Sequence, residues 1–254
     1  MEELNRAIVK TINYGKRYKN KLTLKQLKIR LLSDKVFSGF EIEKAAKKYN
    51  LKKEKKETSS QINEVIRLVN KLAPDFEDIL LIGLTGSVAA ENQKKNDDID
   101  LMVITKQNRL WLTRLRWWSW LKKRSIPQRK YGVTGKKDDI CANLWLEEGT
   151  LSLPMEKRTL KNAVDMMMMK PLISRGNIYQ RFLEQNKWVK KYVANGYQRR
   201  INENIFKSKK KKVKNKNMWK DLINSICFWG QYFYMKKKIR GEIVNKKRAF
   251  FHRK

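Results

Sequence analysis

The sequence predicts an α+β protein in which a small sheet lies between an N-terminal helical module and a C-terminal basic helical region. Two apolar runs of strand length, DILLIGLTGS at 78–87 and IDLMVIT at 99–105, flank a polar spacer, and a third, ICANLWLEE, occupies 140–148. The chain on either side carries apolar residues at helical spacing. With 254 residues, 41% of them hydrophobic, the chain has enough apolar material for a folded core.

Residues 1–57 are predicted to form three short helices. Thr23 with Gln26 and Ser38 with Glu41 have the spacing of a capping box, and each pair precedes an apolar-periodic segment. The last two helices, joined across LLSDKVFSG, have the dimensions of a helix-turn-helix or winged-helix unit. A small bundle that only packs on its neighbour is the alternative, because the third helix carries acidic as well as basic side chains.

The sheet is assigned to a domain at 58–153. The charge-rich stretch LKKEKKETSS at 51–60 marks its boundary, and the amphipathic helix that follows ends at Pro74. Between the second and third strands, NRLWLTRLRWWSWLKKRS is predicted to be a helix with aromatic side chains almost all round. We expect it to pack on the sheet; base stacking and a membrane interface are the alternatives.

The C-terminal region, 154–254, is predicted to be helical to its end. Four adjacent methionines in LKNAVDMMMMKPL lie on all sides of a helix, which favours a role as core filler. The block KSKKKKVKNKNMWK at 207–220 is too polar to fold alone and is predicted to be a flexible basic arm.

The composition limits the function classes. A net charge of +35 favours polyanionic partners: nucleic acid, nucleotides or an anionic membrane surface. Two distant cysteines, Cys141 and Cys227, and a single histidine, His252, argue against a zinc finger, a disulfide framework and Ser-His catalysis. No run approaches the length of a membrane span, and the N-terminus MEELNRAIVK lacks the pattern of a signal peptide, so we expect a cytoplasmic protein.

Two carboxylates one residue apart are the strongest chemical signal. In a strand, Asp98 and Asp100 point to the same face while Ile99 points to the other. Their repulsion would be costly unless a cation binds between them, and hard cations such as Mg²⁺ or Mn²⁺ accept carboxylate together with phosphate oxygens. Gly86 and Ser87, which end the preceding apolar run, could supply backbone N–H groups and a hydroxyl to phosphate.

This order of elements resembles the signature of the DNA polymerase beta-type nucleotidyltransferase superfamily: a strand, a Gly-Ser pair, a spacer, an Asp-x-Asp motif and a second strand. The motif residues in this chain are Gly86, Ser87, Asp98, Ile99 and Asp100. The stretches GSVAAENQKKNDDIDLMVITKQNRLWLTRL, DDICANLWLEE, MMMMKPLISRGNIYQRFLEQNKWVKKY and QYFYMKKK also look like bacterial nucleotidyltransferase-like proteins. Those proteins begin with a winged-helix-like segment similar to AIVKTINYGKRYKNKLTLKQL. The chain departs from many superfamily members at Ala89-Ala90, where they carry an arginine-glycine pair.

The resemblance implies a small mixed sheet and transfer of a nucleotidyl group from an NTP to a hydroxyl acceptor, with two metal ions held by three carboxylates. Asp98 and Asp100 would bridge both metals, and Gly86 and Ser87 would hold the β and γ phosphates. The third carboxylate stands on a later strand in the family, and Asp139 is the candidate here. If the register places Asn143 there instead, the second metal loses a charged ligand.

Three functions remain open from sequence alone. The first is an active nucleotidyltransferase whose acceptor could be RNA or DNA, in keeping with the basic charge. The second is a catalytically degenerate nucleotidyltransferase fold that binds nucleic acid or serves as a scaffold or nucleotide sensor. The third is peripheral membrane attachment through WLTRLRWWSWLKKR and FWGQYFYMKKK, with ordinary buried helices as the alternative for these segments.

Overall fold

The computed structural model divides the chain into two compact units. It describes residues 1–54, 60–93, 97–129, 131, 133, 136–203 and 218–251. The first unit comprises Met1–Thr58, Ser152–Met168 and Phe182–Ile205; the second comprises Ser59–Leu151, Met169–Arg181 and Phe206–Lys254. The region 154–254, predicted as one C-terminal part, is therefore divided between both units. Of the basic arm predicted at 207–220, residues 207–217 lie outside the described part of the chain, and residues 218–220 are described.

The first unit is helical. Its α-helices are α1 (Glu2–Arg17), α2 (Leu24–Arg30), α3 (Gly39–Ala46), α7 (Leu160–Met168) and α9 (Lys190–Asn202), and two 3₁₀ turns lie at Met155–Lys157 and Lys187–Val189. Helix α8 (Ile178–Gln185) contains a boundary between the units. The three helices predicted for the N-terminal module are thus confirmed.

Both predicted capping boxes are present. The Thr23 hydroxyl accepts the Gln26 N–H at 3.2 Å, and the Ser38 hydroxyl accepts the Glu41 N–H at 3.1 Å. Helices α1 to α3 enclose a small core that includes Leu4, Ile8, Leu27, Leu31 and Ile42. Phe40, by contrast, is 77% exposed. The winged-helix assignment of this module stays a prediction.

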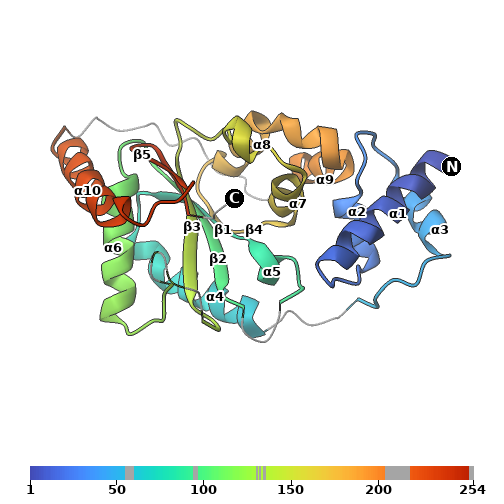
Figure 1. Ribbon diagram of the computed structural model, residues 1–254, viewed down its shortest axis with the longest axis horizontal. Helices are drawn as coiled ribbons and strands as arrows, with labels where there is room; N and C mark the ends of the chain where they lie inside the picture. Colours follow the sequence, from blue (N-terminus) through green and yellow to red (C-terminus); the bar gives the residue numbers. More distant parts are fainter. Residues whose placement is uncertain are drawn as a thin grey trace. The chain divides into compact units, whose positions relative to one another are not determined.

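The second unit holds one six-stranded mixed sheet (Figure 1). Its order is β4 (Lys170–Ser174), β1 (Ile79–Leu84), β2 (Ile99–Thr105), β3 (Ile140–Glu147), β6 (Arg248–Phe250) and β5 (Ile243–Asn245). Strands β2 and β3 are parallel, and every other neighbouring pair is antiparallel. The three predicted strands are confirmed, because their apolar runs are buried at the centre of the sheet.

The prediction of helix from 154 to the end is wrong for β4, β5 and β6. Strand β4 lies at a sheet edge, where Pro171 is tolerated although proline has no amide hydrogen to donate to a neighbouring strand. The hairpin between β5 and β6 turns at Asn245, whose side-chain oxygen accepts the amides of Lys247 at 2.9 Å and Arg248 at 3.0 Å. Strands of three residues surrounded by lysines lack the alternation that would have predicted them.

Helices α4 (Ser60–Leu72), α5 (Gly86–Ala89), α6 (Leu110–Lys123) and α10 (Met218–Lys236), with a 3₁₀ turn at Ala73–Asp75, complete the second unit. Figure 1 shows α6 and α10 side by side. The predicted packing of the α6 aromatics is confirmed for Trp111, Trp117 and Trp120, which are buried, whereas Trp118 is about half exposed. Within the described part of the chain, no helix has the length and apolar character needed to cross a bilayer.

Candidate functional site

The Gly-Ser turn and the Asp-x-Asp pair lie next to each other because β1 and β2 are antiparallel neighbours. Strand β1 ends at Leu84, paired with Leu101, and the Thr85 N–H then donates to the Asp100 carbonyl at 2.9 Å. Gly86 is the first residue of the short helix α5, and Ser87, which is half-buried, is the second. The end of β1 and the start of β2 therefore place both halves of the predicted motif at the same end of these two neighbouring strands.

Gly86 is required at its position for two reasons. Its φ of +67° is in the left-handed region that side chains disfavour, and a Cβ built on it would lie 2.3 Å from Asp100 Oδ2. The Asp100 carboxylate thus rests directly against the backbone of the Gly-Ser turn. This contact links the two parts of the motif physically.

Asp98 and Asp100 converge with a residue that the sequence does not point to, Cys141. The carboxylate oxygens and the thiol sulfur lie within 4.8 Å of one another. Across the residues that the structure describes, this is the only such group of three or more acidic, cysteine or histidine side chains. Cys141 is there because β2 and β3 are parallel with Asp100 opposite Cys141, a register that no local pattern in the sequence reveals.

At neutral pH and without a bound metal ion, the thiol of Cys141 is not the thiolate that acts as a nucleophile. Burial, together with the negative charge of Asp100, raises the pKa of Cys141 to about 12. The side chain is therefore a protonated, neutral thiol between two carboxylates.

Arg129 is a second unpredicted member of the site. Its guanidinium Nη1 lies 3.0 Å from Asp98 Oδ2 and 3.8 Å from Cys141 Sγ, and its Nε donates to the Val133 carbonyl at 3.0 Å. Burial lowers the pKa of Arg129, but its interactions with Cys141 and Asp98, hydrogen bonds included, outweigh this and the pKa is raised. One arginine among 60 basic residues carries no signal in the sequence, and only the fold identifies it.

Asp139 does not join the group. Its carboxylate accepts the Lys136 backbone N–H at 2.8 Å, and its carbonyl accepts the Ile99 N–H at 2.9 Å. The neighbouring Asp138 has a φ of +61° and accepts a hydrogen bond from Gln61 at 2.5 Å. Both aspartates therefore hold the turn before β3, and the role expected of Asp139 as third metal ligand has no geometric support.

Asn143 occupies the place on β3 that contacts Asp100. Strand β3 has one extra residue here, since Leu101 pairs with Ala142 and Met102 with Leu144, and Asn143 falls in this bulge. The side chain of Asn143 is buried, and its amide donates to Asp100 Oδ1. The register left open by the sequence thus places an amide, not a carboxylate, beside Asp100.

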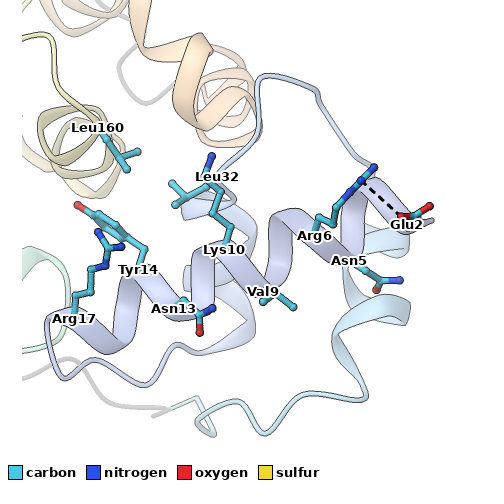
Figure 2. A pocket seen from close by; sticks show the side chains of 10 residues that line it. All are labelled: Glu2, Asn5, Arg6, Val9, Lys10, Asn13, Tyr14, Arg17, Leu32 and Leu160. Carbon is cyan, nitrogen blue, oxygen red and sulfur yellow. Dashed lines mark ion pairs between the residues drawn. The ribbon is translucent and has the colours of Figure 1, made fainter.

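A concave surface of different character lies in the first unit. A cavity of about 610 Å³ is lined mainly by one side of α1, with Tyr14, Arg6 and Arg17 among its residues (Figure 2). Arg6 forms an ion pair with Glu2 at 3.6 Å, drawn as a dashed line in Figure 2. Asp98, Asp100 and their neighbours are not part of this cavity.

Comparison with known proteins returns no match, neither to a protein-family model nor to a curated protein nor to a solved structure.

Proposed function

We propose that the protein is a metal-dependent nucleotidyltransferase that transfers a nucleoside monophosphate from an NTP to a hydroxyl acceptor. One observation carries the proposal: Asp98 and Asp100 converge at the start of β2, and Asp100 rests against the backbone of Gly86. A carboxylate pair next to a Gly-Ser turn is the arrangement that a cation-bound triphosphate requires, because the cation and the phosphates must be held side by side.

The site residues fit one divalent cation well. Asp98 and Asp100 supply hard oxygen ligands of the kind that Mg²⁺ and Mn²⁺ prefer, whereas the protonated Cys141 thiol does not compete for such ions. Asn143 could turn its amide oxygen to the same ion, since its two amide ends have equal size. A bound cation would neutralise phosphate charge and lower the pKa of an acceptor hydroxyl.

The remaining roles fall to residues of the chain itself. Gly86 allows close approach of phosphate oxygens to the backbone, and the Ser87 hydroxyl is a further donor. Arg129, with 35% of its side chain exposed, can present its planar fork to a phosphate while it stays beside Asp98. The net charge of +35 favours RNA or DNA as the acceptor.

A second candidate function is binding of nucleotide or nucleic acid without transfer. It is favoured by the ion pair between Arg129 and Asp98 and by Asn143 in place of a third carboxylate. In this case the site would recognise an NTP but would not activate an acceptor hydroxyl, since one charged ligand is missing.

Titration calorimetry of each NTP with Mg²⁺, followed by a pyrophosphate-release assay with total cellular RNA, separates these functions. We expect binding and release for the wild type, and loss of release in Asp100→Asn. Asp165→Asn, which removes a partly exposed carboxylate on α7, is the matched control and should behave as wild type. Binding without release that no acceptor restores would favour the second function. Absence of any metal-dependent NTP binding would refute the transferase and would leave only the binding of nucleic acid.

A further inference from the structure

Helix α10 packs on α6 through a face that combines polar and apolar side chains. Its Asp221 forms an ion pair with Arg109 at 2.5 Å, and the Asn224 side-chain oxygen accepts the N–H groups of Trp111 at 2.9 Å and Leu112 at 3.0 Å. Gln231 donates to the Trp111 carbonyl at 2.8 Å. These bonds, with buried Phe228 and Met235 on the same side, fix the rotation of α10 about its axis against α6.

The opposite face of α10 is apolar and exposed. Trp219, Ile226 and Phe233 have exposed fractions of 73%, 62% and 63%. At helical spacing they line up with further exposed apolar residues into one stripe along the helix. The other members of this outer face are Leu222, Ile223, Trp229 and Tyr234. A surface helix normally exposes only scattered large apolar side chains, and a contiguous exposed apolar stripe of this kind marks an interaction surface.

The charges around the outer face identify the chemistry of that partner. Lys220 and Lys236 are exposed near the two ends of α10, followed by Lys237, Lys238 and Arg240. Lys238 also lies over the Tyr234 ring at 5.1 Å, and Lys246 lies over the Trp229 ring at 5.8 Å. An apolar stripe with cations at both ends is complementary to a surface that is anionic outside and apolar beneath.

Three occupants could be imagined, and the residues favour one. A second copy would bring two strongly basic helix ends together, which electrostatic repulsion opposes. Nucleic acid would use the tryptophans and lysines, but the aliphatic Leu222, Ile223 and Ile226 have no planar face on which a base can stack. Acyl chains accept aliphatic and aromatic side chains alike, and Trp and Tyr favour the headgroup level of a bilayer.

We propose that α10 is a membrane-surface helix whose outer face inserts into the interface of an anionic bilayer, with its flanking lysines on the lipid phosphates. The inserted depth is that of a helix lying in the plane of the membrane, in keeping with the finding that no described helix could span it. The proposal stands independently of the Asp98 and Asp100 site, because it uses only the outer face of α10.

Flotation of the full-length protein with vesicles tests the proposal. The vesicles contain phosphatidylcholine with about one third phosphatidylglycerol, and phosphatidylcholine alone serves as the neutral comparison. A protein of charge +35 will adhere to anionic lipid by charge alone, so the decisive measurement is binding that persists at high salt. We expect Ile226→Ser combined with Phe233→Ser to weaken this salt-resistant binding about tenfold or more.

The matched control is Phe40→Ser combined with Met155→Ser, which removes two exposed apolar side chains from the first unit and should bind as wild type. A second readout is quenching of tryptophan fluorescence by lipids brominated in the acyl chain. The quenching should fall when Trp219 and Trp229 are both replaced by phenylalanine. All four residues of the two serine pairs are exposed, so far-ultraviolet circular dichroism should be unchanged in both variants.

Three results would overturn the proposal. The first is absence of flotation, or equal salt-resistant flotation of wild type and the Ile226→Ser, Phe233→Ser variant. The second is a dimer in solution that this variant dissolves, which would assign the outer face to a second copy. The third is displacement of the protein from vesicles by RNA without any acyl-chain quenching, which would assign the face to nucleic acid.

Discussion

Replacing Gly86 by alanine tests the contact that joins the two halves of the candidate site. The second unit offers an internal control, because Gly176 has nearly the same φ, +65° against +67°, but no atom within 4 Å of the position that a Cβ would take. Alanine in the left-handed region costs about 1–2 kcal/mol. Gly176→Ala should therefore lower the free energy of unfolding by about that amount and no more.

Gly86→Ala adds a steric conflict to the same backbone strain. The new Cβ would lie 2.3 Å from Asp100 Oδ2 and 3.1 Å from Asp100 Cβ and Cγ, so the carboxylate must move. The movement breaks the hydrogen bond from the Asn143 amide, and a bond to a charged group contributes about 1.5–3 kcal/mol. The loss of unfolding free energy in Gly86→Ala should thus reach about 2.5–5 kcal/mol.

Urea unfolding measures both variants, and calorimetry with Mg²⁺ in the presence of NTP measures the site. We expect Gly86→Ala to lose cation-dependent binding, and Gly176→Ala to retain it at the wild-type affinity. Equal stability losses in the two variants, or unchanged binding in Gly86→Ala, would refute the claim that Gly86 positions Asp100.

Two further changes probe buried polar groups on β3. Asn143→Asp should lower the free energy of unfolding by at least about 3 kcal/mol in EDTA at neutral pH, because the new carboxylate repels Asp100, and Mg²⁺ should restore more stability to this variant than to the wild type. Asn13→Asp, at an exposed position on α1, is the control. If Asn143→Asp is as stable as the wild type in EDTA, this reasoning is contradicted. Glu147 is buried, and burial raises its pKa although the backbone amides of Asn108, Leu110 and Arg109 oppose the rise. A carboxyl whose pKa is raised by folding favours the folded state when protonated, so the stability of the wild type relative to Glu147→Gln should be greatest in acid and should decline as the pH rises through the raised pKa. Urea unfolding at a series of pH values measures this difference, and a difference that grows with pH would show that the charged form is the stabilised one.

The sequence is most informative where local chemistry decides the structure. Capping residues such as Thr23 and Ser38 and the apolar run of β2 act within a few residues, and their elements are predicted with the observed bounds or close to them. Strands β4 and β6 escape prediction because pairing with distant strands, not their own composition, makes them strands, and β5 then pairs with β6 alone. The exposure of the outer face of α10 is likewise not predicted, because hydropathy alone does not distinguish a core from a docking surface.

The candidate site divides in the same way. Gly86, Ser87, Asp98 and Asp100 lie near one another in the sequence and form a pattern that can be recognised. Cys141, Arg129 and Asn143 enter only through the parallel register of β2 and β3 and its bulge. The choice between Asp139 and Asn143 depends on a shift of a few residues in that register, which a single sequence does not specify.

The charge balance of the assembled site favours a single bound cation. Two carboxylates and one guanidinium give a net charge of −1, with Cys141 and Asn143 neutral, so one divalent cation brings the total to +1. Three carboxylates with two divalent cations, the arrangement implied by the family resemblance, also total +1. Arg129 therefore supplies part of the positive charge that a second cation would provide, without its ability to activate a hydroxyl. If the proposed function is correct, a difference from a two-cation site should therefore appear in the rate of transfer more than in the affinity for nucleotide.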